Sequence, residues 1–429
     1  MKMMNAPRSG AVAVFLVIVL SAFVAVAALL FMGAKSAAGR SIADGALQSA
    51  GRSVLSEYDN RLLKDYGILA FKGDEASIEK DIKFYADAAL SPRDPFYALI
   101  RKGGSSIRTV DTRVEDAEAS LKEYSLLDLD NFEDQIRTAS LTGRALIGGP
   151  GGSGGAGGDS GTPDEDKDNG RVLRKDSVID SLPSEGYSGP VFPSFSGIPD
   201  LVRGGDPFKS GTTAFLVNEY ALNLFGNRLN AAPRDEHFFR NEVEYLIAGY
   251  RSDDSNYSSI KMRLRVLFAG LNEVSLHNDA AKMAICLEIG GPLAVAAGLP
   301  PEVGQEIVAG VWVSGETEND INLLEAGKKV SLFKTQGQWA TQNIVDIWNG
   351  WTDGSLVEPA DGSGLNYKDY LRVLLFMLDR ETKLLRMMDL MQINLKGTYA
   401  GDFLMREYYI GYRFSCTVDG DTYEYIEKY

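Results

Sequence analysis

The sequence predicts an α+β fold with three parts: an N-terminal transmembrane helix, a helical arm that continues it, and a helix-rich mixed extracytoplasmic region. The first observation behind this prediction is an uncharged apolar run over residues 11–32. The second is that apolar residues recur every three or four positions in most later segments, which is the period of an amphipathic helix. The third is the alternating aromatic and β-branched pattern of residues 403–429, which is typical of strands.

Residues 11–32 read AVAVFLVIVLSAFVAVAALLFM, and Ser21 is the single polar residue among them. A helix over this run would be ~33 Å long, which is enough to cross a hydrocarbon core of ~30 Å. A cleaved secretory signal is the alternative, because AKSAAG at 34–39 offers small residues, but the run exceeds the usual signal length of about 7–15 residues. We therefore expect a retained anchor, with these residues among its lipid-facing positions: Ala11, Phe15, Leu20, Phe23, Leu29 and Met32.

The charges beside the apolar run do not decide its orientation, because bases lie on both sides of it: Lys2 and Arg8 before, and Lys35, Arg40 and Arg52 after. The sizes of the flanking parts are more informative, since the tail over residues 1–10 is too short to carry a domain. We therefore expect a single-pass protein of the cell membrane with residues 33–429 outside the cytoplasm. One helix would provide its contact with the lipid bilayer.

The helical pattern continues beyond the apolar run, from Ile42 to Tyr66, and small residues dominate its first half. One interpretation, which periodicity alone favours, is an arm that packs on its own downstream domain. The other is an arm that bundles with helices of other subunits, since small residues let helices approach closely. Under the second interpretation, these residues would make the partner-helix contacts: Ala43, Ala46, Leu47, Ala50, Val54 and Tyr58.

The arm and a small mixed domain are predicted to occupy residues 33–147. After the arm, Gly67 is expected to cap the helix in the left-handed conformation, and Ser77 is expected to cap the next helix. The expected elements are a strand over 68–71, a helix over 77–90, a strand over 107–114 and a helix over 131–147.

A flexible linker is predicted over residues 148–190. It opens with GGPGGSGGAGGDSG and continues with the acidic string TPDEDKDNG. Such a composition has too little apolar surface to offset the entropy of ordering the chain. We expect this linker to separate the first region from a second globular domain.

The second domain, over residues 191–429, is predicted to be α+β with helix predominant. Pro301 fits the first turn of a helix, and the sequence Gly290-Gly291-Pro292 is expected to interrupt the helix that contains it. The expected elements are helices over 214–225, 242–247, 260–275, 280–297, 301–314 and 367–391, followed by strands over 403–429.

Composition excludes some classes of function. The formal net charge of −15 disfavours nucleic acid as a partner, because that binding depends on Lys and Arg neutralising phosphates. Two cysteines, Cys286 and Cys416, are too few for a disulfide framework, although they could pair outside the cytoplasm. In the apolar run MAICLEI, Cys286 is better explained as a small buried hydrophobic residue.

No catalytic, cofactor-binding or metal site is predicted. The string GGSGG at 151–155 matches a nucleophile-elbow pattern, but it lies in the glycine linker and not between a strand and a helix. The two histidines, His237 and His277, are too few for a histidine metal site, and both are expected at polar surface positions. A carboxylate-pair hydrolase stays open, because many acids are present and sequence cannot place two at catalytic separation.

Several strings carry a resemblance to a known family. They are RSG at 8–10, IADGA at 42–46, EYDNRLLKDYGILAF at 57–71, SLLDLDNFEDQI at 125–136, NEYALNLFGNR at 218–228, EVEYLIAG at 242–249, LLEAGKKVSLFK at 323–334 and YKDYLRVLLFMLDRETKLLRMMDLMQIN at 367–394. Together they resemble the TadE/TadG-like proteins of tight-adherence (Flp) pilus loci, and in particular a longer branch of that group. The resemblance covers most of the chain except the glycine linker.

The resemblance implies a pseudopilin-like envelope protein that assists pilus assembly and is not an enzyme. Its partners would be other membrane proteins of a pilus or secretion system. Phe15 stands five residues after Gly10, where prepilin-peptidase substrates carry Glu, so we expect the N-terminal tail to be kept.

Two other hypotheses remain from the residues themselves. One is a surface binding module, for example for carbohydrate, with Trp339, Trp348 and Trp351 lining its site, although packing tryptophans are the simpler explanation. The other is a tethered hydrolase.

Overall fold

The computed structural model describes residues 9–90, 114–144, 171–173, 181–185, 187, 211–232, 237–335, 338–343, 347, 356–359, 361–398, 402–418 and 420–429. Two compact units are present. The first comprises Met1–Asp59, Ala70–Ser125 and Glu407–Tyr429, and the second comprises Asn60–Leu69 and Leu126–Arg406. This division differs from the contiguous domains expected from the sequence, because the last strands of the chain pair with a strand of its N-terminal third.

The first unit is an antiparallel sheet packed against two helices. Its helices are α1 (Ser9–Leu55) and α3 (Glu75–Leu90), and its strands are β2 (Val114–Ser120), β4 (Gly411–Val418) and β5 (Asp421–Lys428). The strand order is β2-β4-β5, with Ala117 opposite Cys416 and Phe414 opposite Tyr425. A two-stranded sheet joins β1 (Phe71–Lys72) to β3 (Tyr408–Tyr409), and the short 3-10 helix η1 (Lys122–Tyr124) also belongs to this unit. A second short 3-10 helix, η5 (Met405–Glu407), begins in the second unit and ends at the first residue of the returning segment.

Strand alternation builds the core of this unit. In β4 every second residue is buried, so Tyr412, Phe414 and Cys416 lie on one face while Arg413 is exposed. That buried face packs with apolar residues of α1 and α3 in one cluster. The strands predicted over 403–429 are therefore confirmed, and their apolar face explains why the unit folds around α1.

Two predicted boundaries in this part were wrong, and a third prediction lies almost wholly outside the described residues. The helix predicted through Tyr66 ends at Leu55, and α2 (Asn60–Tyr66) starts after a turn in which the Asp59 amide donates to the Ala70 carbonyl at 2.8 Å. Helix α3 starts before Ser77, because the Asp74 carboxylate accepts from the Ser77 amide at 3.1 Å and so acts as its cap. Of the strand predicted over 107–114, only Val114 is described, and it begins β2.

The second unit is built from helices. Besides α2 they are α5 (Leu129–Leu141), α8 (Gly211–Leu224), α9 (Glu242–Ala248), α10 (Asp253–His277), α11 (Ala280–Ala296), α12 (Pro301–Glu325), α14 (Tyr367–Met377) and α15 (Arg380–Thr398). Every residue of α9 (EVEYLIA) is buried, including its two acids, Glu242 and Glu244. The helices α8, α9, α10 and α12 confirm the predicted segments, although α10 and α12 are longer than expected.

Three further expectations were wrong in the second unit. The helix predicted over 131–147 ends at Leu141 within the described residues. The helix predicted over 367–391 is divided, because Leu378 has an extended backbone with ψ of 138°. Helix α11 runs through Pro292 without interruption, because its packing along α12 offsets the one backbone hydrogen bond that proline cannot donate.

Part of the predicted linker belongs to the folded second unit. Val172 pairs with Ser252 in an isolated bridge, and the Leu173 amide donates to the Arg251 carbonyl at 2.8 Å. Farther along, the Ser184 amide donates to the Asp389 carboxylate at 3.0 Å. The expectation of a linker up to residue 190 is therefore corrected at these positions, while residues 145–170 lie outside the described part.

Candidate membrane anchor and interaction surface

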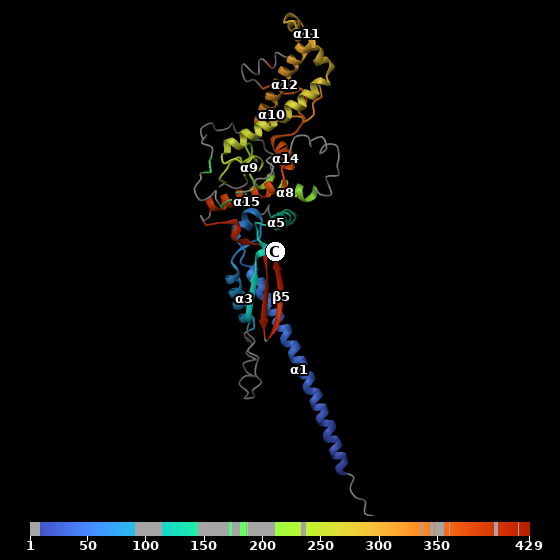
Figure 1. Cartoon of the computed structure of the whole chain (residues 1–429), viewed down its shortest axis with the longest axis vertical. Coiled ribbons are helices and arrows are strands. Elements are labelled where there is room, and N and C mark those ends of the chain that lie inside the picture. The colour runs from blue at the N-terminus through green and yellow to red at the C-terminus, as the bar shows by residue number, and fades with distance from the viewer. Residues whose placement is uncertain are drawn as a thin grey trace, which may run out of the picture. The chain divides into compact units, whose positions relative to one another are not determined.

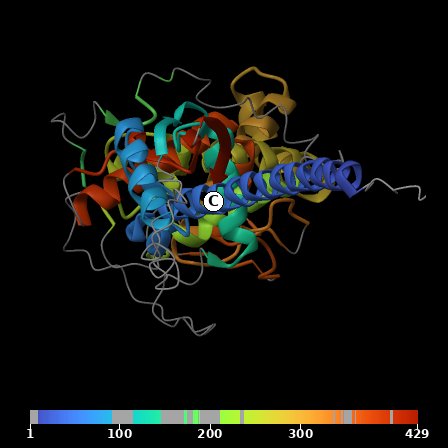
Figure 2. The ribbon, with the colours of Figure 1, turned by 90° about the horizontal axis from the view of Figure 1, so that it is seen from below.

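The first half of α1 is an apolar helix whose side chains no other described residue covers. Phe15, Phe23 and Met32 are 67%, 71% and 67% exposed, and Ser21 donates to the Ile18 carbonyl within the helix. Figures 1 and 2 show α1 as one unbroken helix. Among the described residues, α1 is the one helix that is both long enough and apolar enough to span a membrane. Leu20 and Leu29 are exposed in the same way, whereas the side chain of Ala11 lies outside the described part.

The second half of α1 is buried by the first unit itself. The residues assigned to partner-helix contacts are mostly in its core, with exposures of 2% for Ala43, 9% for Ala46, 0% for Leu47, 1% for Ala50 and 2% for Val54. The hydroxyl of Tyr412 also donates to the Gly51 carbonyl at 2.8 Å. The assignment to a partner helix is therefore corrected, because the chain's own sheet covers this apolar stripe. Tyr58, beyond the end of α1, remains 37% exposed.

A second apolar surface lies on the helical hairpin formed by α11 and α12. Gly298, with φ of 75°, ends α11, and the Leu299 amide donates back to the Ala294 carbonyl at 2.8 Å. This is a Schellman ending, and Pro301 then opens α12. The helices approach most closely at Gly290 and Gly304, where a Cβ added to Gly290 would lie 2.0 Å from the Gly304 carbonyl oxygen.

Two helices can bury only the stripes that face each other, yet the sequence of α11 is apolar on all sides. Its outer side chains are therefore exposed, with Leu293 at 69% and Val295 at 59%, and Ile307 of α12 is 60% exposed. Exposed apolar residues of the same hairpin are Ile285, Leu287, Ile289, Leu299, Val303 and Val311. Such a concentration of exposed apolar side chains is typical of interaction sites. We call this surface the hairpin tip and define it as residues 285–311.

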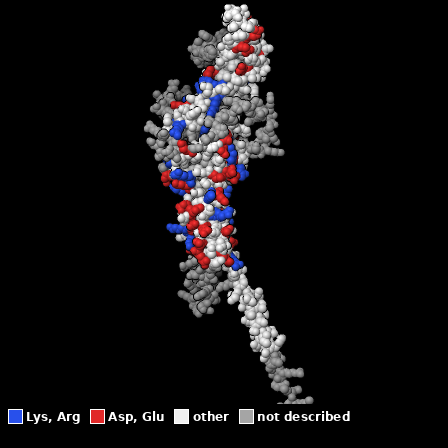
Figure 3. Space-filling view, in the orientation of Figure 1, with Lys and Arg blue, Asp and Glu red and all other residues white. Residues whose placement is uncertain are grey.

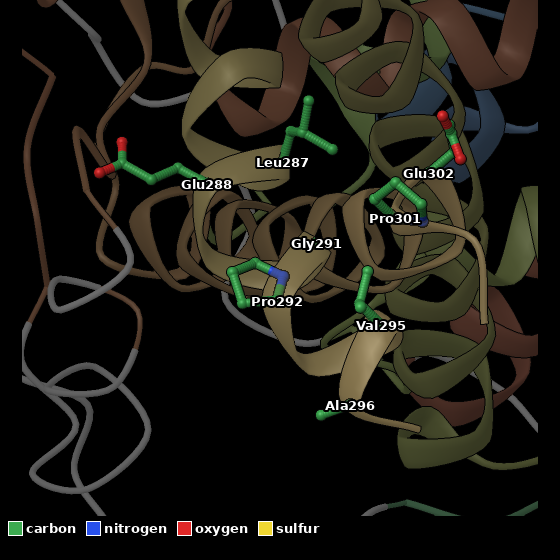
Figure 4. Close-up of a pocket in the computed structure, with 8 residues that line it drawn as sticks. All are labelled: Leu287, Glu288, Gly291, Pro292, Val295, Ala296, Pro301 and Glu302. Carbon is green, nitrogen blue, oxygen red and sulfur yellow. The ribbon is translucent and has the colours of Figure 1, made fainter. Parts of the chain in front are cut away.

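The hairpin tip contains an open hollow of about 770 Å³ lined by Leu287, Glu288, Gly291, Pro292, Val295, Ala296, Pro301 and Glu302. Figure 4 shows Glu288 and Glu302 on opposite sides of the apolar lining. No Lys or Arg occurs between Lys282 and Lys328 in the sequence. On the face shown in Figure 3, most of the tip is uncharged and its charged patches are acidic. Basic atoms lie over α10. The surface is apolar with an acidic rim.

A buried charged cluster holds the base of this hairpin. The Lys334 ammonium lies 2.6 Å from Asp320 and also pairs with Glu316, and all three side chains are at most 3% exposed. Glu316 accepts from the Ala340 and Thr341 amides at 2.9 and 2.8 Å. Burial raises the pKa of Asp320, and the nearby Lys334 ammonium opposes that shift. The cluster thereby fixes the segment after α12 onto α12 itself.

Tryptophans extend this cluster. The Lys282 ammonium lies 4.7 Å from the ring centre of Trp312 and 4.8 Å from that of Trp339, both within cation–π range. Trp339 is 1% exposed, so it is a packing residue and cannot line an open carbohydrate site. Trp348 and Trp351 lie outside the described part.

The close approach of the two hairpin helices gives a first testable prediction. Gly290→Ala should lower the free energy of unfolding by about 1–3 kcal/mol, because its methyl group would overlap the backbone of Gly304. Gly310→Ala on α12 is the matched control, since nothing lies within 4 Å of an added Cβ there, and it should stabilise by about 0.5–1 kcal/mol. Thermal unfolding monitored by tryptophan fluorescence measures both. Equal effects of the two substitutions would contradict the helix contact.

The histidines divide into one buried and one exposed residue. His237 was expected at the surface, but its side chain is 8% exposed and its Nδ1 lies 2.6 Å from the Glu242 carboxylate. Asn394 donates to the same carboxylate at 2.7 Å. Within the described residues no hydroxyl or thiol is hydrogen-bonded to His237, so this pair has no nucleophile beside it. His277 is exposed as predicted, and hydrogen bonds to the Glu273 carbonyl and Glu306 raise its pKa.

Glu244 is the other buried acid of α9. Burial raises the pKa of Glu244 to about 7, against hydrogen bonds donated by the Arg228 amide and the Tyr367 hydroxyl at 2.9 and 2.8 Å. The residue is 0% exposed, so no substrate reaches it in this state. A perturbed pKa can mark a catalytic acid, but here it reflects desolvation inside the helical core.

This acid gives a prediction on pH dependence. Between its unfolded pKa of about 4.3 and its folded value, the folded chain retains a proton that the unfolded chain has lost, so stability falls as pH rises through this window. Glu244→Gln removes the titration. Relative to wild type, the free energy of unfolding of the variant should therefore rise by up to about 3 kcal/mol as the pH increases from 4 to 8. Chemical denaturation at a series of pH values measures this difference. Exposed Glu424→Gln is the control, and a pH-independent difference for Glu244→Gln would refute the assignment.

The two cysteines are both buried. Cys286 and Cys416 are free and buried at 0% and 1% exposure, and burial raises the pKa of both thiols. Within the described residues, no group of three or more His, Cys, Asp or Glu side chains could hold a metal ion. Sequence reasoning missed the hairpin tip, although AICLEIGGPLAVAAGLPP, with one charge and no polar face, was a signal for it.

Comparison with known proteins identifies one family. Residues 171–420 match the model of a family described as "Family of unknown function (DUF5702)", which is more than half of the chain. The chain belongs to this family. The DUF5702 match includes the hairpin tip and the buried charged cluster, and it leaves α1 outside. Neither the curated proteins nor the solved structures gave a match.

Proposed function

We propose that this DUF5702 chain is a membrane-anchored structural component of a pilus or secretion assembly of the tight-adherence type, pseudopilin-like in design. It is held by α1 with its folded units outside the cytoplasm, and it acts through protein–protein contacts. A surface binding module or a tethered hydrolase is the alternative.

The observation that carries the proposal is the division of α1 into two halves within one continuous helix. Its first half is apolar and exposed, while its second half is a core element of the first unit. A helix of this kind can lie in lipid or among apolar helices of neighbouring subunits while its folded unit stays outside. The resemblance of residues 42–46 and 57–71 to TadE/TadG-like proteins gives the type of assembly.

The hairpin tip adds a second contact surface, which favours an assembly component over an enzyme. An enzyme needs convergent reactive groups in a cleft, whereas the hollow at the tip is lined by apolar side chains and two acids. Trp339 is 1% exposed and the His237 side chain is 8% exposed, which weakens the support that these two residues gave to the alternatives.

The decisive experiment is affinity purification of a C-terminally tagged copy from native membranes in mild detergent, with partners identified by mass spectrometry. We expect enrichment of pilins, a secretion ATPase or inner-membrane platform proteins. A tagged chain that starts at residue 33 and is directed outside the cytoplasm by a cleavable signal is the control, and it should lose these partners. Recovery of the full chain without any of them would overturn the proposal.

A further inference from the structure

Helix α10 exposes an apolar stripe that complements the hairpin tip. Met262, Val266 and Val274 are 57%, 53% and 62% exposed, and they follow one another at multiples of four residues with Gly270 between them. Residues at this spacing lie on one face of a helix. Gly270 has nothing within 4 Å of an added Cβ, so the face is open at its middle.

Bases flank the first half of this stripe, whereas the tip carries acids. Lys261, Arg263 and Arg265 alternate with its apolar residues, whereas the tip has Glu288, Glu302 and Glu306 and no base. Lys261 and Arg265 pair with acids of α12 but remain 26% and 34% exposed. Figure 3 shows the same contrast between basic atoms over α10 and acidic patches at the tip.

We propose that two copies of this chain pair through these surfaces in antiparallel fashion, with the hairpin tip of each copy on the α10 stripe of the other. The pairing rests on the proposed assembly function and adds one partner to it, a second copy of the chain. It buries both apolar surfaces and places acidic tips against basic stripes. A parallel pairing would bring the acidic tips together, which like charges disfavour.

Dimensions and symmetry agree with this arrangement. The α10 stripe over residues 262–274 and the tip face of α11 over residues 285–296 are each about 17–18 Å long at the helical rise. Because each copy offers both surfaces, two identical contacts form around a twofold axis, and the association closes as a dimer. Gly270 lets the partner helix approach closely, as small residues do at helix contacts.

Cysteine crosslinking in native membranes tests the pairing. Two differently tagged full-length copies, one with Val266→Cys and one with Val295→Cys, are coexpressed and treated with a short bis-maleimide. The parent chain sets the background, because Cys286 and Cys416 are buried. We expect the heterotypic 266–295 product to exceed both homotypic products several-fold. Exposed Val172→Cys, combined with Val295→Cys, is the control and should stay at background.

Gly270→Leu provides an independent check. The site is open in the single chain, so the fold tolerates leucine, but the side chain would obstruct a partner helix. We expect the crosslink to be lost with thermal stability kept, whereas Gly397→Leu, also at an open helical position, leaves the crosslink unchanged. A dominant 295–295 product, no product above background, or a product insensitive to Gly270→Leu would each overturn the pairing. Copurification of pilus proteins in that case would still support the proposed function.

Discussion

Leu20→Arg combined with Phe23→Arg is expected to release the chain from the membrane. Both side chains lie on the exposed apolar half of α1, at 56% and 71% exposure, so the chain's own core does not depend on them. An arginine near the middle of a membrane helix costs about 2.5–3.5 kcal/mol on insertion scales, so the pair should cost about 5–7 kcal/mol. This is the largest effect that we expect from two substitutions.

Flotation of cell lysates in a density gradient measures the effect, because membrane-inserted chains float and aggregates sink. The conservative pair Leu20→Ile and Phe23→Leu is the matched control and should float like wild type. If the arginine variant floats to the same extent as wild type, α1 is not the anchor, and its apolar half must be covered by other protein helices.

Lys334→Met is expected to lower the free energy of unfolding of the second unit by about 3–5 kcal/mol, because it leaves buried carboxylates without their counter-charge. Glu316 and Asp320 are 0% and 1% exposed, so water cannot replace the lost ammonium. Since burial raises the pKa of Asp320, protonation relieves the unpaired charge as the pH falls. The deficit should therefore be smaller at pH 5 than at pH 8.

Tryptophan fluorescence during chemical denaturation reports this change locally, because Trp312 and Trp339 pack beside the cluster. Lys328→Met is the matched control: Lys328 pairs with Glu358 at the surface, with 52% and 61% exposure, and such pairs contribute about 0–1 kcal/mol. Asp320→Asn added to Lys334→Met should recover part of the loss. If Lys334→Met and Lys328→Met cost the same, the cluster does not hold the hairpin base.

The buried charged cluster holds the base of the hairpin whose tip is exposed. A two-helix hairpin with apolar outer faces has little core of its own, so its orientation depends on what fixes its base. Lys334, Glu316 and Asp320 supply that fixation, and Gly290 with Gly304 keeps the two helices in register. A rigid base lets the exposed tip present its apolar surface at a defined place, which an assembly contact requires.

The sequence alone determined the features that depend on local pattern. The uncharged run after Gly10 is sufficient for a membrane-length helix, because length and apolarity are properties of one segment. Helical periodicity located α8, α9, α10 and α12, and alternation located β4 and β5. Gly67 adopts the expected left-handed conformation, with φ of 68°, because the requirement at a helix end is also local.

Only the tertiary structure decided which of these segments share a core. Strand β4 pairs with β2, and Tyr412 donates to the Gly51 carbonyl, across separations that no local period encodes. The same pairing buried Leu47 and Ala50, which the sequence left open to a partner helix. In the second unit, the packing of distant helices buried His237 beside Glu242 and left Leu293 exposed. Hydrophobicity says that a side chain avoids water, but the neighbours that cover it are set by the packing of distant segments.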